Sequence, residues 1–140
     1  MRLFQHIVFI CVIVLASGCG PKKQKQTTTE SKEQVTKGKA KFAFDEEIHN
    51  FGSLKNNVKV SYTFAFKNVG GQDLLISRVD EGCSCTTVTW PQRAIKAGET
   101  EYIEVVLDTH GENGNLYRTV TLFSNATEKQ KELIITAFIQ

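Results

Sequence analysis

The 140-residue sequence has no apolar run long enough to cross a bilayer as a helix. Its longest run, from Ile7 to Ala16, has ten residues, whereas a transmembrane helix needs about 20. The formal net charge is only +2, which gives no indication of nucleic-acid binding. The sequence also lacks a capped helical period, a Ser/His/Asp order, paired catalytic carboxylates and a phosphate-binding glycine loop. It therefore predicts a protein that is not an enzyme and binds no nucleic acid.

Cysteine is scarce, and the N-terminal segment holds two of the four. Arg2 gives a positive start, and the Ile7–Ala16 run has the length of a secretory h-region. Ala16-Ser17-Gly18-Cys19 follows and resembles the bacterial lipobox, whose cysteine receives a diacylglycerol and becomes the new N-terminus. The lipobox more usually has Leu at the position of Ala16. We predict a lipoprotein signal peptide over residues 1–18 and lipidation of Cys19, with a plain signal peptide as the alternative.

Residues 19–41 are predicted to form the lipidated cysteine and a disordered basic tether. Residues 21–41 hold seven Lys against two Glu, a net charge of +5, and almost no large apolar side chains. Such a segment cannot bury enough apolar surface to offset the entropy of ordering. Its lysines could lie on anionic headgroups, but a solvated spacer is the favoured role. Residues 42–140 hold nine basic and thirteen acidic side chains, −4 in all, and so form a separate, mildly acidic body.

That body, residues 42–140, is predicted to be all-β. Apolar and polar residues alternate through 58–67 and again through 102–107, and this period of two is typical of half-buried strands. Extended segments over 116–123 and 133–139 complete the pattern, and turns such as 68–71 separate the strands. Roughly seven strands in about 100 residues predict an immunoglobulin-like sandwich. The seven Phe after residue 40 are assigned to its core.

The second pair of cysteines, Cys83 and Cys85, is the only candidate site of chemistry in this domain. In a straight strand such residues hold their Cβ atoms about 7 Å apart, whereas a disulfide needs about 3.8 Å, so a bond requires a bend. Gly82 allows one. Buried structural thiols, a disulfide, a Cu(I) site, a thiol-redox role and a mixed disulfide with a partner all stay open. The sequence cannot place His49 or His110 near the pair, and no cofactor is expected, with Cu(I) as the alternative.

Five motifs together resemble the bacterial domain-of-unknown-function family fifteen-seventy-three, over about residues 42–140. They are Phe51-Gly52-Ser53-Leu54, Phe64-Ala65-Phe66-Lys67-Asn68-Val69-Gly70, Cys83-Ser84-Cys85-Thr86, Ile95-Lys96-Ala97-Gly98-Glu99 and Phe123-Ser124-Asn125. Ser84 stands where the family usually has Gly, and Ala97 where it usually has Pro. The resemblance implies an immunoglobulin-like module similar to PapD-like and Hydin-type domains, frequent export in bacteria, often as lipoproteins, and no known activity.

These observations predict a membrane-anchored, non-enzymatic binding or scaffolding module of the bacterial cell envelope. Its lipid would hold it on a membrane facing the periplasm, and its partner would be another envelope protein. Exposed sheet edges are the expected docking surface, by strand addition. The alternative is a thiol-redox or copper-handling protein that acts through Cys83 and Cys85.

Overall fold

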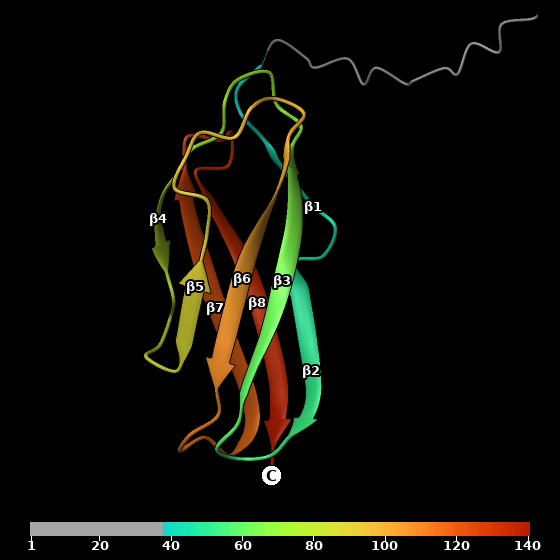
Figure 1. Cartoon of the computed structure of the whole chain (residues 1–140), viewed down its shortest axis with the longest axis vertical. Helices are drawn as coiled ribbons and strands as arrows, with labels where there is room; N and C mark the ends of the chain where they lie inside the picture. Colours follow the sequence, from blue (N-terminus) through green and yellow to red (C-terminus); the bar gives the residue numbers. More distant parts are fainter. Residues whose placement is uncertain (1–37) are drawn as a thin grey trace, which may run out of the picture. The chain divides into compact units, whose positions relative to one another are not determined.

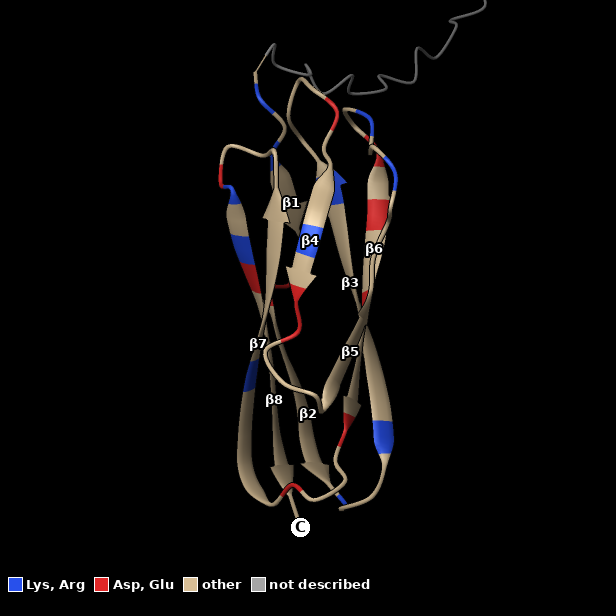
Figure 2. Ribbon diagram, turned by 90° about the vertical axis from the view of Figure 1, so that its left-hand side faces the viewer, with Lys and Arg blue, Asp and Glu red and all other residues tan. Residues whose placement is uncertain are grey.

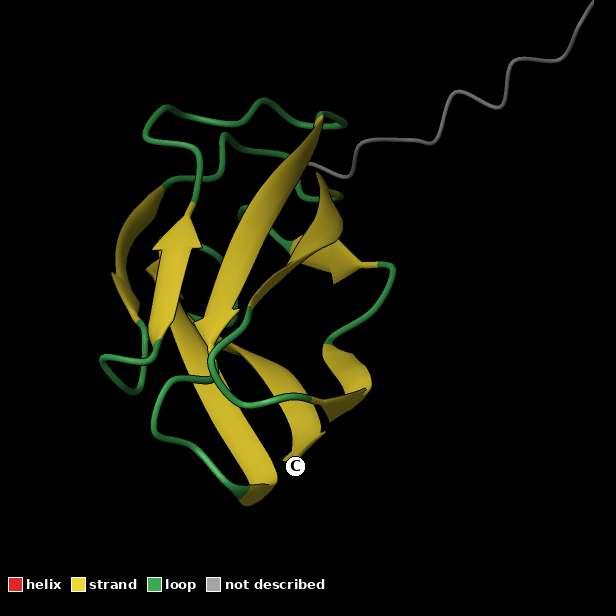
Figure 3. Ribbon diagram, turned by 60° about the horizontal axis from the view of Figure 1, so that its bottom comes forward, coloured by secondary structure: helices red, strands yellow, loops and turns green. Residues whose placement is uncertain are grey.

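The computed structural model of the chain describes residues 38–140, in which every regular element is a strand (Figures 1 and 3). The strands are β1 (Phe42–Phe44), β2 (Ile48–Leu54), β3 (Lys59–Asn68), β4 (Ile76–Asp80), β5 (Thr86–Thr89), β6 (Thr100–Asp108), β7 (Gly114–Ser124) and β8 (Gln130–Ile139). In this part of the chain, no helix has the length and apolar character needed to span a membrane. The predicted signal peptide, Cys19 and the tether up to residue 37 lie outside the described residues.

The strands form two four-stranded sheets. Sheet A has the order β1-β3-β6-β5, and sheet B has the order β2-β8-β7-β4. Neighbouring strands are antiparallel except β2 and β8, which run parallel. Sheet A reproduces the ABED order of the immunoglobulin fold, and β4, β7 and β8 reproduce its CFG sheet. The predicted immunoglobulin-like sandwich is confirmed. The described strands number eight because the first one divides between the sheets as β1 and β2.

The core lies between the sheets and is built from alternate residues of the strands. On β3, Phe64 and Phe66 are buried while Ser61 and Thr63 face solvent. The inward residues of β6 and β8 that are fully buried are Ile103, Val105, Leu107, Leu133 and Ile135. Burial of one such side chain contributes about 1.5–3 kcal/mol, so a one-residue slip of a strand would lose several such contributions.

Asn68, at the end of β3, is buried and uses both ends of its side-chain amide. Its Oδ1 accepts hydrogen bonds from the backbone N of Gly70 at 3.0 Å and of Lys41 at 3.3 Å. Its Nδ2 donates to the carbonyl oxygens of Gln72 at 2.8 Å and Ile95 at 2.9 Å. One side chain therefore joins the segment before β1, the β3–β4 turn and the β5–β6 connection.

The sandwich begins earlier than the predicted boundary at Phe42. Ala40 is fully buried, and its carbonyl oxygen accepts a hydrogen bond from the backbone N of Thr127 at 2.9 Å. The carbonyl oxygen of Gly38 accepts another from Gly71 at 3.0 Å. Residues 38–41, which the sequence analysis placed in the tether, are therefore held against the sandwich in this structure. Composition missed them because backbone hydrogen bonds and one small side chain, which leave no apolar pattern, hold them in place.

Candidate functional site

The main candidate site is the Gly82–Thr86 loop, which joins β4 of sheet B to β5 of sheet A. Within it, Cys83 and Cys85 form a disulfide, with their Cα atoms 5.2 Å apart. The required bend is present, since the backbone N of Thr86 donates to the carbonyl oxygen of Cys83 at 3.3 Å and closes a turn. Of the fates that the sequence left open, this structure shows the disulfide.

Gly82 lets the chain enter this turn. Its φ is +73°, in the left-handed region that residues with a Cβ rarely adopt. A Cβ at this position would also lie 2.4 Å from the carbonyl oxygen of Thr119 on β7. The Gly82 backbone N donates to Oδ1 of Asp80 at 3.0 Å. Backbone conformation and close packing both require glycine here, which presses the loop against β7.

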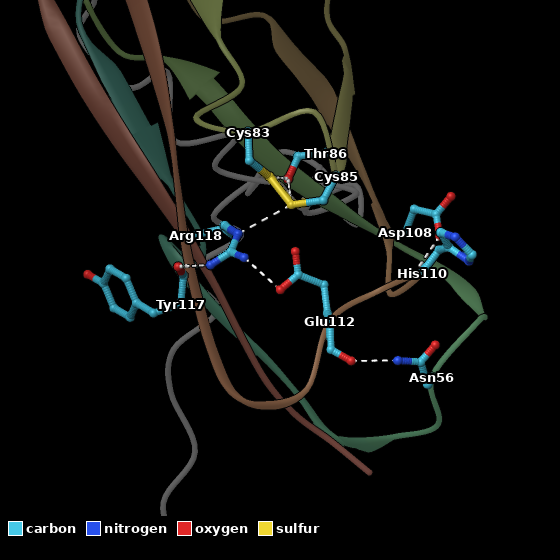
Figure 4. A network of polar contacts seen from close by, with 9 residues as sticks. All are labelled: Asn56, Cys83, Cys85, Thr86, Asp108, His110, Glu112, Tyr117 and Arg118. Carbon is cyan, nitrogen blue, oxygen red and sulfur yellow. Dashed lines mark hydrogen bonds and ion pairs between the residues drawn. A yellow bond between two sulfur atoms is a disulfide. The ribbon is translucent and has the colours of Figure 1, made fainter.

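The two sulfur atoms have different surroundings (Figure 4). The Nε of Arg118 donates a hydrogen bond to the Sγ of Cys85 at 3.3 Å. The Oγ1 of Thr86 lies 3.2 Å from the Sγ of Cys83 and 3.8 Å from that of Cys85. Cys85 is half-buried and packs against the hydrophobic core. Cys83 lines an open hollow whose other lining residues are Arg78, Val79, Asp80, Glu81, Gly82 and Ser84.

Arg118 projects from a position where β7 points inward. Its neighbours on that side of the strand, Leu116 and Val120, are both buried. The Nη2 of Arg118 lies 2.8 Å from Oε2 of Glu112, and the carbonyl oxygen of Glu112 accepts a hydrogen bond from Nδ2 of Asn56 at 2.6 Å (Figure 4). A partly buried cation is costly unless it has partners. Glu112 and the disulfide supply them, and together they enclose the guanidinium at the edge of the sandwich.

The loop also closes the outer edge of β5. The backbone N of Thr86 bonds to Cys83, and that of Val88 donates to Oε1 of Glu81 at 2.9 Å. Both donors point away from β6 and would otherwise be open to another chain. Strand addition, which the sequence suggested for exposed edges, therefore meets an edge at β5 whose two outward N–H donors are already used.

This disulfide closes too small a ring to stabilise the fold strongly. The two cysteines are separated by two positions in the sequence. In the chain-entropy model a loop of about three residues gives roughly 1.6 kcal/mol at 25 °C, against about 3 kcal/mol for a 15-residue loop. The disulfide therefore adds little to the stability of the fold. Its chemical reactivity is the property from which a function can be argued.

The histidines that the sequence could not place lie away from the sulfurs. His49 stacks on Tyr62 with ring centroids 3.5 Å apart, and Nδ1 of His110 lies 2.6 Å from Oδ1 of Asn57. Within residues 38–140, no three or more His, Cys, Asp or Glu side chains gather into a group that could hold a metal ion. In the disulfide form neither sulfur is a thiolate, which is the form that binds Cu(I).

The sequence placed Cys83, Cys85 and Thr86 in one motif but did not connect Arg118 or Glu112 with them. The contact from Arg118 to Cys85 joins residues 33 positions apart, so no local pattern reports it. One signal was available. In β7 the alternation that places Leu116 and Val120 inward also places a charged residue, Arg118, on the same side. A charge at an inward position indicates a partner elsewhere in the chain.

A second candidate surface lies on the outer face of sheet B. We call it the apolar strip, and it consists of Ile48, Tyr117, Ile134 and Phe138. Tyr117 is 60% exposed, Ile48 56% and Phe138 46%. Ile48 pairs with Ile134 across β2 and β8, while Tyr117 pairs with Thr136, which lies between Ile134 and Phe138 on β8. The four large side chains are therefore neighbours on one face.

The position of Phe138 corrects the assignment of all seven later Phe residues to the core. Ala137 and Ile139, its neighbours in sequence, are buried, and successive residues of a strand face opposite sides. Phe138 must therefore face outward. An open hollow of about 440 Å³ adjoins it, lined also by Tyr117, Thr136 and the bulge residue Gly52.

One end of the apolar strip, around Tyr117 and Phe138, has no charged neighbour on β2 or on residues 133–139 of β8. Strand β2 and residues 133–139 of β8 contain no Lys, Arg, Asp or Glu. In Figure 2 the lower parts of β2, β7 and β8 are accordingly tan, apart from one basic band on β7. The single basic residue of β7 is Arg118, whose position points inward. The outer surface around Tyr117 and Phe138 is therefore uncharged. At the other end of the strip, Ile48 and Ile134 share a hollow with Glu47, Glu128, Lys131 and Glu132.

Comparison with known proteins gives a family and a fold. The sequence profile of a family described as "Protein of unknown function (DUF1573)" matches residues 42–139. No match was found among curated proteins. Similar solved structures include a protein of unknown function from Porphyromonas gingivalis W83, with a TM-score of 0.61 and 14% identity over 74% of this chain and 48% of that one.

Two further structures have a TM-score of 0.55. The Vibrio cholerae VesB protease is 15% identical over 72% of this chain and 31% of its own. The ASH/PapD-like domain 7 of human CEP192 is 7% identical over 91% of this chain and 96% of its own. The chain thus spans about half or less of the Porphyromonas and VesB structures. At such identities the likeness shows the fold alone.

Proposed function

This chain belongs to the DUF1573 family of proteins of unknown function, and from its immunoglobulin-like fold we propose a non-enzymatic binding module of the bacterial cell envelope. A lipid on Cys19 holds it at a membrane, residues 20–37 act as the spacer, and the domain faces the periplasm. Its partner is another envelope protein, which docks on the apolar strip.

The apolar strip is the observation that carries this proposal. Single exposed apolar side chains are ordinary, but here three exposed ones and the half-buried Ile134 lie on one sheet face. Aromatic residues such as Tyr117 and Phe138 are enriched in the centres of protein interfaces. The hollow beside them can take an anchoring side chain of a partner. The outward N–H groups of β5 are bonded to its own preceding loop. The outer face of sheet B is therefore a better docking surface than the β5 edge.

The lack of charge around Tyr117 and Phe138 supports one kind of partner. Nucleic acids and anionic lipid headgroups are bound through Lys and Arg, and the apolar strip contains neither. A protein surface with an apolar anchor and few charges matches it. We therefore assign the strip to a protein partner.

The strip also has a suitable place in the domain. The described chain begins at Gly38 at one end of the sandwich, while β8, which carries Phe138, ends at the other (Figure 1). Tyr117 and Phe138 would thus be presented at the end farther from the point where the spacer attaches.

Site-specific photo-crosslinking in intact cells tests the proposal. A photoreactive residue replaces Tyr117 in one variant and Tyr102 in the control, because Tyr102 is 57% exposed on sheet A. We expect position 117 to join one envelope protein, with loss of the adduct in a Phe138→Ser background. An adduct of two copies of this chain, or equal labelling from position 102, would overturn it. The Cys19→Ser variant should leave the membrane fraction.

A further inference from the structure

We propose that the Cys83–Cys85 disulfide is a thiol-exchange site, which accepts two electrons from a dithiol. Cys83 is the sulfur that is attacked, and Cys85 is the leaving group. The Gly82–Thr86 loop carries this function independently of the apolar strip, so either proposal can fail without the other.

The bond has the properties of an exchangeable disulfide. The bond joins residues with a sequence separation of 2, so the loop that it closes is short and stabilises the fold only weakly. It lies in a loop whose residues Gly82 and Ser84 are exposed, so a thiol can approach it. Accessible disulfides outside the packed interior are those that exchange with thiols.

The surroundings of the two sulfurs decide the direction of attack. Both cysteines are half-buried, but Cys83 lines the open hollow beside β4, whereas Cys85 packs against the core. An incoming thiolate approaches from the open side, in line with the S–S bond, and therefore meets Cys83 first. The Nε of Arg118 lies 3.3 Å from the sulfur at the far end of that line.

The exchange proceeds in two balanced steps. A thiolate of the dithiol attacks Sγ of Cys83, the S–S bond breaks, and its electron pair passes to Cys85 as a thiolate. The second thiol of the donor, after losing its proton, attacks its own sulfur in the mixed disulfide and expels Cys83 as a thiolate. The donor leaves oxidised, Cys83 and Cys85 remain reduced, and the two protons of the donor pass to the two thiolates or to solvent.

Arg118 is the positioning residue for this exchange. A thiolate is stabilised by a nearby cation, and a better-stabilised leaving thiolate departs faster. Glu112 fixes the guanidinium through its 2.8 Å ion pair, so the Nε hydrogen stays directed at Cys85. Thr86 adds a hydroxyl beside Cys83 at 3.2 Å, which can donate to the second thiolate.

The first experiment follows reduction of the oxidised full-length chain by dithiothreitol, with glutathione as the monothiol comparison. Free thiols are alkylated with iodoacetamide at successive times, and tryptic peptides are weighed. Cleavage after Arg78 and Arg93 gives a peptide, residues 79–93, that contains Cys83 and Cys85 and no other cysteine. We expect dithiothreitol to reduce the folded protein fully, and Arg118→Met to slow this by about three- to tenfold.

Matched variants separate the electrostatic effect from a loss of fold. Arg118→Lys keeps a cation and should recover part of the rate, and Glu112→Gln keeps the guanidinium but loosens it. Each rate is measured in buffer and in urea, where all variants should react alike because the contact is gone. If Arg118→Met does not fold, the Lys and Gln variants still carry the comparison. A native disulfide that resists excess dithiothreitol, or folded variants with equal rates, overturns the proposal.

The second experiment assigns the two sulfurs. In Cys83→Ser the remaining Cys85 thiol faces Arg118, and in Cys85→Ser the remaining Cys83 thiol does not. We expect Cys85 to react with iodoacetamide at lower pH than Cys83, and Arg118→Met to remove the difference. Identical pH profiles in the two single variants would overturn the assignment of Cys85 as the leaving group.

Discussion

Arg118 and Cys85 are joined by a hydrogen bond of 3.3 Å from a guanidinium nitrogen to a sulfur. The contact connects β7 of sheet B with the residue that leads into β5 of sheet A. It explains how an arginine can occupy an inward position between Leu116 and Val120. The guanidinium meets a carboxylate on one side and a polarisable sulfur on the other, so the charge keeps partners at the edge of an apolar core.

The disulfide should contribute little to stability. Because it closes a loop of about three residues, the Cys83→Ser/Cys85→Ser variant should lose no more than about 2 kcal/mol of unfolding free energy. Urea unfolding of this variant beside the oxidised wild type measures the difference. A loss above about 4 kcal/mol, or failure to fold, would mean that the bond is a structural staple after all.

Substitution of Gly82 should be more damaging than substitution of another left-handed glycine. Gly82→Ala adds a Cβ at 2.4 Å from the Thr119 carbonyl oxygen at a φ of +73°, whereas Gly98 has a φ of +82° and nothing within 4 Å of such a Cβ. Gly98→Ala should cost about 1–2 kcal/mol through backbone strain alone. Gly82→Ala should exceed it by about 1 kcal/mol or more. Equal losses in urea unfolding would contradict the close contact with β7.

The stability of the folded protein should depend on the side-chain amide nitrogen of the buried Asn68. In Asn68→Asp the donating Nδ2 becomes an oxygen that faces the carbonyl oxygens of Gln72 and Ile95. Two buried hydrogen bonds are lost and replaced by repulsion, so we expect a loss of about 3 kcal/mol or more. Asn125→Asp is the control, because the exposed Asn125 makes a similar bond to Asp73. Comparable losses at the two sites would show that burial does not set the cost.

Glu99 should make stability depend on acidity. The Arg93 guanidinium, followed by the Lys96 backbone N, donates to its carboxylate and lowers its pKa from 4.5 to about 2. Since the folded-state pKa lies below the unfolded one, the stabilisation is complete above about pH 4.5 and is lost as pH falls toward 2.

The Glu99→Gln variant should remove this dependence. Its urea midpoint should fall less between about pH 5 and pH 2 than that of the wild type. Glu104→Gln, which replaces an exposed carboxylate on β6, serves as the control and should follow the wild type. If the wild type and Glu99→Gln fall in parallel, the contacts of Glu99 with Arg93 and Lys96 do not stabilise the folded protein.

The all-β architecture could be predicted because its cause is local. A period of two along β3 and β6 places Phe64, Phe66 and Val105 on one face without knowledge of the rest of the chain. The division of the first strand between two sheets could not be read in this way. It depends on how residues 45–47 cross from one sheet to the other, and such a crossing leaves no periodic pattern.

The same distinction between local and long-range causes applies to the candidate sites. Cys83 and Cys85 are adjacent enough in sequence for geometry alone to require a bend between them. The partners of the disulfide come from β7 and the loop before it, and the apolar strip is assembled from three strands. Phe138 could have been placed outside from the alternation of β8, but counting aromatic residues as core ignored that alternation.

The parallel pairing of β2 with β8 has a mechanical consequence. Tension applied between Gly38 and a partner held near Phe138 would pull along the strands rather than across them (Figure 1). The hydrogen bonds between β2 and β8 would then be loaded in shear and share the force, instead of breaking one at a time.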